Sequence, residues 1–143
     1  LPVGLNMIEE VDRASNARPD SQVLSVLIVD DEPEVAELIA EILQLDGHST
    51  EIANNGHLAL EALEKSEFQI ILSDLRMPDY DGPWLFEKLQ DQYPDLVSRT
   101  AFVTGDTLSS DIAMFLKNAG RPHIEKPITP REVRSLVSLL LVP

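Results

Sequence analysis

The chain has 143 residues, enough for one domain with its own apolar core and too few for two ordinary domains. Its 25 acidic side chains outnumber 11 basic ones, a formal net charge of -14, which disfavours nucleic acid as a partner because binding requires neutralised phosphates. The absence of cysteine excludes disulfides, thiolate metal sites and cysteine nucleophiles.

The first 22 residues lack a sustained hydrophobic period and are rich in polar and turn-forming residues. We predict a linker or N-terminal extension over residues 1–22 and one folded domain over residues 23–143. No apolar run approaches membrane-spanning length, so we expect no membrane contact by this domain. The absence of cysteine fits the cytoplasmic location that we expect.

The folded part begins with an apolar, β-branched run from Val23 to Val29, which predicts a strand covered on both faces. Asp30 and Asp31 follow this strand, and Pro33 suits the first turn of a helix. The helix is expected to turn one apolar face inward, carrying Val35, Leu38, Ile39, Ile42 and Leu43.

Four more strand and helix pairs follow in alternation. Turn residues, a Pro94 stop, a Gly120 stop and a capping box opened by Thr129 separate them. The strands are predicted at residues 49–53, 69–74, 100–103 and 123–125, and helices at segments around Ala59–Leu63, Leu85–Leu89, Ile112–Ala119 and Val133–Leu140. Strands alternating with helices predict an α/β fold, a doubly wound five-stranded parallel sheet with five helices.

Polar side chains stand at the ends of four of these strands. They are Asp30, Asp31, Asp74, Thr104 and Lys126. Because the carboxyl ends of parallel strands share one edge of the sheet, we expect these side chains to meet there.

Three neighbouring carboxylates repel one another, and a hard dication such as Mg2+ relieves that repulsion. A magnesium site beside a carboxylate suits phosphoryl transfer, and Asp74 is the candidate nucleophile that forms an aspartyl-phosphate. Lys126 and Thr104 are candidates to bind phosphoryl oxygens.

Residues 23 to 141 resemble the receiver domain of two-component response regulators. The motifs that carry the resemblance are Val29-Asp30-Asp31-Glu32, Leu72-Ser73-Asp74-Leu75-Arg76-Met77-Pro78 with Asp81-Gly82, Thr104, and Lys126-Pro127. The resemblance implies a flavodoxin-like sheet of strand order 2-1-3-4-5 with the site at its switch point, and a cis bond before Pro127.

The resemblance also implies roles for individual residues. Asp74 is the phosphoacceptor, charged by a phosphohistidine or an acyl phosphate. Mg2+ is bound by Asp31 directly, by Asp30 mostly through water, by Asp74, and by the backbone carbonyl of Arg76. The phosphoryl oxygens are then held by Thr104 and Lys126.

Two features, which involve three positions, depart from the family pattern. His123 stands where the family usually has a switch aromatic, three residues before Lys126, and suggests a pH-dependent switch; the alternative is an exposed strand residue. Arg76 and Asp106 stand at positions that, by the resemblance, flank the path of the attacking water, and they are predicted to slow hydrolysis as a pair; the alternative is two solvated side chains.

The expected partners are a histidine kinase or a histidine phosphotransfer domain, with the domain itself a monomer or weak dimer that catalyses only its own phosphorylation and dephosphorylation. The segment Gly120–Pro127 is similar to C-terminal receivers of hybrid histidine kinases, and Leu1-Pro2-Val3 to the end of a kinase ATP-binding domain. The alternatives are a pseudo-receiver that only binds partners and a magnesium-dependent aspartyl-phosphate phosphatase, which the separation of Asp74 from the acidic pair disfavours.

Overall fold

The computed structural model describes residues 23–105 and 109–142, so the predicted linker and Asp106 lie outside the described residues. The strands are β1 Ser25–Val29, β2 Ser49–Ala53, β3 Ile70–Asp74, β4 Thr100–Thr104 and β5 His123–Glu125. The helices are α2 Pro33–Leu45, α3 Gly56–Lys65, α4 Gly82–Gln92, α5 Pro94–Val97, α6 Ser110–Ala119 and α7 Pro130–Leu140. No helix in the described ranges is both long enough and apolar enough to cross a membrane.

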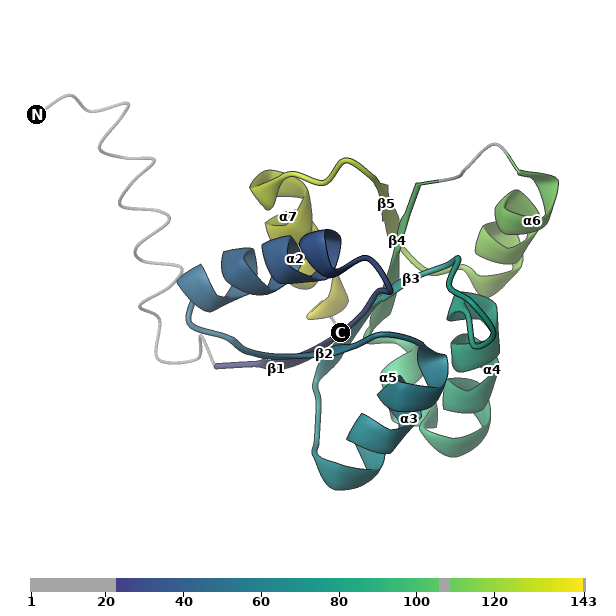
Figure 1. Ribbon diagram of the computed structural model, residues 1–143, viewed down its shortest axis with the longest axis horizontal. Coiled ribbons are helices and arrows are strands. Elements are labelled where there is room, and N and C mark those ends of the chain that lie inside the picture. The colour runs from purple at the N-terminus through teal and green to yellow at the C-terminus, as the bar shows by residue number, and fades with distance from the viewer. Residues whose placement is uncertain (1–22, 106–108, 143) are drawn as a thin grey trace, which may run out of the picture.

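The five strands form one parallel sheet in the order β2-β1-β3-β4-β5, which confirms the predicted doubly wound topology. The described part of the chain enters the sheet at the inner strand β1, moves to the edge at β2, and crosses back past β1 to β3 (Figure 1). This reversal leaves β1 and β3 side by side, with their following loops diverging to opposite faces. Such a switch point is where open α/β sheets place their binding sites.

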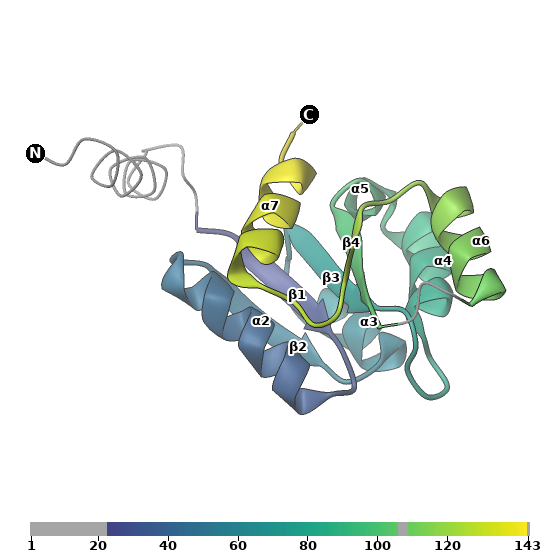
Figure 2. The same cartoon turned by 90° about the horizontal axis from the view of Figure 1, so that it is seen from above.

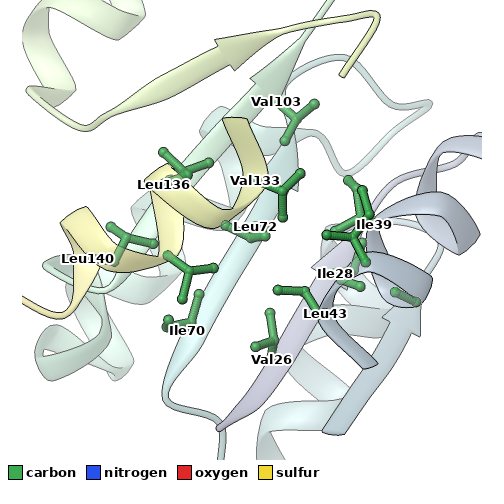
Figure 3. Packing of buried hydrophobic residues seen from close by; sticks show 14 of the residues in the cluster. Val26, Ile28, Ile39, Leu43, Ile70, Leu72, Val103, Val133, Leu136 and Leu140 are labelled. Atoms are coloured by element: carbon green, nitrogen blue, oxygen red, sulfur yellow. The ribbon is translucent and has the colours of Figure 1, made fainter. Parts of the chain in front are cut away.

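Helices cover both faces of the sheet. Helices α2 and α7 lie on one face and α3, α4 and α6 on the other (Figures 1 and 2). Alternate residues of β1 serve the two cores, since Val26 and Ile28 face α2 and α7 while Leu27 and Val29 face α3 and α4. Figure 3 shows the first of these cores, in which Val133 of α7 closes over the strands. Full burial on both faces explains the nearly continuous apolar composition of β1.

The described residues contain one helix beyond the five predicted. Helix α4 ends at Gln92, as expected, but Pro94 opens the short helix α5 instead of only ending the previous one. Tyr93, with φ -136° and ψ 59°, breaks the helical path between them. Proline fits the first turn of a helix as well as the end of one, so its presence alone does not distinguish a stop from a restart.

The buried face of α2 includes Ile39, Ile42 and Leu43 as predicted, but it differs from the prediction at Leu38. Leu38 is 42% exposed and Val35 only partly buried, whereas the small residues Ala36 and Ala40 are buried beside Ile39. The buried face of α2 therefore includes Ala36 and Ala40, and Leu38 lies outside it. The sequence pattern gave most weight to the large apolar side chains, which placed Leu38 on the wrong side.

Local signals at the loops are confirmed. Thr129 and Glu132 form the predicted reciprocal capping box at the start of α7, and Gly120 ends α6 with a φ of +65°. The Lys126-Pro127 bond is cis, as the resemblance implied.

Gly82, the first residue of α4, lies very close to the backbone at the end of β3. Its amide donates to the Leu75 carbonyl at 3.0 Å, and a Cβ there would lie 2.6 Å from the Asp74 carbonyl oxygen. The two atoms nearest to such a Cβ, the Asp74 carbonyl oxygen and the Leu75 Cα, belong to the backbone and cannot rotate away. Only glycine therefore allows this approach, and the approach fixes the loop that follows Asp74.

We predict that Gly82→Ala lowers the free energy of unfolding by about 1–3 kcal/mol, because a methyl group forced against backbone must displace it. Equilibrium urea unfolding followed by circular dichroism measures the change. Gly105→Ala is the matched control, since its Cβ would meet only the Lys126 Cδ atom at 3.7 Å. Equal stability of the two variants would contradict the proposed role of Gly82.

Candidate functional site

The carboxyl edge of the sheet gathers the polar residues that the sequence analysis singled out. Asp74 and Thr104 are the last residues of β3 and β4, Asp30 follows β1, and Lys126 follows β5. Of the polar or charged side chains that are buried in the described part of the chain, three belong to this group: Asp30 at 1%, Asp74 at 5% and Thr104 at 1% exposure. Buried polar groups need partners, so these three call for an explanation.

Three carboxylates form the centre of the site. One oxygen each from Asp30, Asp31 and Asp74 lies within 4.8 Å of the others. Asp31 is exposed, whereas Asp30 and Asp74 are buried. The cluster therefore has a buried floor and one side open to solvent.

The Asp74 carboxylate is held by the backbone of its own loop. Its Oδ1 accepts hydrogen bonds from the amides of Leu75 at 2.8 Å and Arg76 at 3.4 Å. Its Oδ2 accepts from the Lys126 ammonium at 3.1 Å. The side chain is thus fixed in one orientation toward the cluster.

Lys126 is the cation of this cluster. Its Nζ lies 3.1 Å from Asp74 Oδ2, 3.2 Å from Asp30 Oδ2 and 2.5 Å from Glu32 Oε1. The side chain is only 15% exposed, and its amide donates to the Thr104 carbonyl at 2.8 Å. Since β5 pairs with β4 here, the sheet itself delivers Lys126 to the carboxylates.

Burial changes the acidity of these groups. Desolvation raises the pKa of Asp30 from 3.8 to about 6; the Asp74 charge adds to this rise, while the Glu32 amide and Lys126 oppose it. Desolvation likewise raises the pKa of Asp74, against the opposing effect of Lys126. Burial by itself would lower the pKa of Lys126, but Glu32, Asp74 and Asp30 outweigh it and raise that pKa. The fold thus holds its carboxylates at a cost in free energy, as functional sites commonly do.

The cluster has the chemistry of a site for a hard dication. Asp30 Oδ1 accepts the Glu32 amide at 2.9 Å, but the buried Oδ2 accepts no hydrogen bond among the described residues, although Lys126 Nζ is 3.2 Å away. Its lone pairs face a cluster in which one ammonium serves several carboxylates. Convergent oxygen donors without nitrogen or sulfur ligands match the preference of Mg2+.

The structure places the other predicted residues less centrally. The Arg76 guanidinium reaches from the loop after β3 to the start of α6, donating to Ser109 Oγ at 2.9 Å and Asp111 Oδ1 at 3.2 Å. The predicted partner Asp106 lies outside the described residues. His123 is an exposed residue of β5, in keeping with the alternative given for it above.

Two contacts of the site were not predicted from the sequence. Glu32 was part of a recognised motif without an assigned role, yet it makes the shortest contact with Lys126. Asp111 was not considered as a partner for Arg76. Neither contact has a local sequence signal, because each pair is brought together only by the packing of distant elements.

A doubly wound parallel sheet with an acidic cluster and a lysine at its switch point defines the class of domain. Residues 26–138 match the family model described as the response regulator receiver domain. This chain belongs to the response regulator receiver family.

Related proteins of two kinds were found. The chain is 29% identical over 116 residues to the probable transcriptional regulatory protein TcrX of Mycobacterium tuberculosis, covering 81% of this chain and 49% of that protein. It is also 29% identical over 137 residues to the sensor histidine kinase RcsC of Escherichia coli, covering 91% of this chain and 14% of that protein. The chain therefore spans half or less of the length of these relatives.

Solved structures agree with the fold. A CheY-like response regulator receiver domain protein from Methanospirillum hungatei superimposes with a TM-score of 0.73 at 30% identity, covering 82% of this chain and 92% of that one. A putative response regulator from Chloroflexus aurantiacus gives a TM-score of 0.74 at 25% identity, covering 84% and 98%.

The raised pKa of Asp30 predicts a pH-dependent cost to stability. Its protonated form is the one the fold favours, so the stabilisation is complete below pH 3.8 and is lost as pH rises through about 6. In EDTA at pH 7, Asp30→Asn should therefore exceed wild type in free energy of unfolding by about 1–3 kcal/mol.

Urea unfolding across pH 4.5 to 7.5 tests this, with the difference between the variant and wild type expected to be smallest at the acid end and to widen as pH rises to about 6. Asp91→Asn, a substitution of an exposed carboxylate in α4, controls for net charge. A gap between Asp30→Asn and wild type that does not widen with pH would contradict the assignment.

Proposed function

We propose that this domain is the phosphoacceptor of a two-component or phosphorelay system, with Asp74 as the phosphorylated residue. The observation that carries the proposal is the buried Asp74 carboxylate, bonded to Lys126 and within 4.8 Å of two further aspartates at the sheet edge. Membership of the receiver family supports it.

The proposed reaction is an in-line displacement at phosphorus. A carboxylate oxygen of Asp74 forms a bond to phosphorus while the bond from phosphorus to the donor breaks, and the donor, a histidine imidazole or an acylate, leaves. The two loop amides that hold Asp74 Oδ1 orient the carboxylate before the donor arrives. The product is an acyl phosphate on the side chain.

The residues proposed to hold Mg2+ are Asp30, Asp31, Asp74 and the backbone carbonyl of Arg76. The bound ion supplies charge neutralisation between carboxylates and phosphoryl oxygens. Lys126 is proposed to donate to a phosphoryl oxygen from the position where it now donates to Asp74, and the Thr104 hydroxyl to donate to another.

The proposed partner is a histidine kinase or a histidine phosphotransfer domain, in line with similarity to RcsC and to transcriptional regulators of this family. Whether the parent chain is a hybrid kinase stays a prediction from the sequence, as does the cytoplasmic location. Phosphorylation would then switch the surface that the partner recognises.

Incubation with acetyl phosphate and Mg2+ should add one phosphoryl group and release acetate, because Asp74 is oriented for attack and its neighbours are placed to bind the phosphoryl oxygens. Intact-mass spectrometry measures the addition. The gain should disappear with EDTA and in Asp74→Asn, which keeps the shape of the side chain without its charge.

Each alternative has its own signature in this experiment. A folded wild-type protein that gains no mass from acetyl phosphate or from its cognate kinase would be a pseudo-receiver. Repeated hydrolysis of a phosphorylated small molecule would indicate a phosphatase, since a receiver is modified once per event.

Arg76 is proposed to slow hydrolysis, because its guanidinium extends from the Asp74 loop to α6 and limits the approach of water. We expect Arg76→Ala to shorten the phosphorylated lifetime by up to about fivefold, in keeping with the modest strength of an exposed ion pair. Decay of the phosphorylated mass after donor removal measures the lifetime. Arg131→Ala, on the exposed start of α7, is the control, and an unchanged lifetime in Arg76→Ala would reject this role.

A further inference from the structure

Lys126 is shared unequally among its carboxylate neighbours. The contact with Glu32 Oε1, at 2.5 Å, is shorter than those with Asp74 Oδ2 and Asp30 Oδ2 at 3.1 and 3.2 Å. An ammonium has three protons and donates most strongly where the acceptor is nearest. Among the described residues, Lys126 is the cation that contacts this cluster. Its strongest contact is therefore with Glu32 and not with Asp74 or Asp30.

Glu32 has no structural duty that accounts for this contact. It occupies the N-cap position of α2, yet its side chain makes no capping hydrogen bond, and Asp30 Oδ1 instead accepts the Glu32 amide. Its side chain is 59% exposed, so burial does not force it toward Lys126 either. Its backbone is anchored by Pro33 and by the Ala36 amide, which donates to its carbonyl at 3.1 Å. The backbone of Glu32 is thus fixed, and its side chain extends to Lys126.

We propose that Glu32 is an internal competitor that holds Lys126 away from the phosphoryl group and so restrains phosphorylation of Asp74. The inference rests on the function proposed above for Asp74 and Lys126. It assigns Glu32 a positioning role, since its carboxylate acts through Lys126 and need not touch the phosphoryl donor.

The competition follows from the geometry of the lysine. A phosphoryl group on Asp74 presents oxygens to Lys126, and the ammonium must then loosen its contact with Glu32 or divide its protons further. Either change costs free energy in the phosphorylated state and in the transition state that leads to it. Removing the Glu32 acceptor removes this cost and leaves Lys126 to the phosphoryl oxygens.

Three variants separate a direct contact from a general charge effect. Glu32→Gln removes the charge, Glu32→Asp keeps the charge but shortens the arm by one methylene, and Glu34→Gln removes a charge from an exposed neighbour in the first turn of α2. With Mg2+ and acetyl phosphate, the phosphorylation rate constant should rise about three- to tenfold in Glu32→Gln. Glu32→Asp should show most of that rise, and Glu34→Gln little of it.

A double-mutant cycle with Lys126→Gln tests whether the effect passes through the lysine. The gain from Glu32→Gln should vanish in the Lys126→Gln background. Persistence of the gain there, a rate equal to or below wild type in Glu32→Gln, or a wild-type rate in Glu32→Asp would each overturn the proposal.

A second readout does not depend on phosphorylation. Glu32 Oε1 lies 2.5 Å from Lys126 Nζ, so removing this acceptor should make the ammonium more accessible and increase the rate at which acetic anhydride labels Lys126 in EDTA. Peptide mass spectrometry measures this rate relative to the exposed Lys117. Faster labelling without any phosphorylation of wild type would reject the proposed function alone, whereas normal phosphorylation with unchanged labelling would reject the role of Glu32.

Discussion

The site depends on one constraint, the convergence of several carboxylates on a single lysine at the buried edge of a parallel sheet. The topology imposes it, because β1, β3 and β5 all end at that edge and each delivers a charged residue there. Burial then makes the charges expensive, as the raised pKa values of Asp30 and Asp74 record. The surrounding apolar cores supply the stability against which this cost is set.

The sequence was sufficient for the fold and for most of the cluster. Apolar runs such as Val26–Val29 identified the strands, and the capping box at Thr129 identified the last helix, because both signals are local. The meeting of Asp30, Asp74 and Lys126 could also be foreseen, since parallel strands bring their carboxyl ends to one edge whatever the details of packing.

What the sequence could not supply depends on packing distances. Whether Leu38 or Ala40 faces the sheet is decided by how closely α2 approaches it, and hydrophobicity alone favours the larger residue. The contact of Glu32 with Lys126 joins residues 94 positions apart, and its length depends on the exact direction of α2. The partner of Arg76 on α6 has the same origin.

The close approach of Gly82 to the backbone of Asp74 has a consequence for how the protein can vary. The hydrogen bond from the Gly82 amide to the Leu75 carbonyl closes the loop between them at its base. This closure is made by backbone atoms and does not depend on the side chains farther along the loop. Exposed residues of the loop, such as Pro78, are therefore open to substitution without displacing Asp74. Side chains of this loop can therefore change what the domain recognises while the Asp74 carboxylate keeps its position.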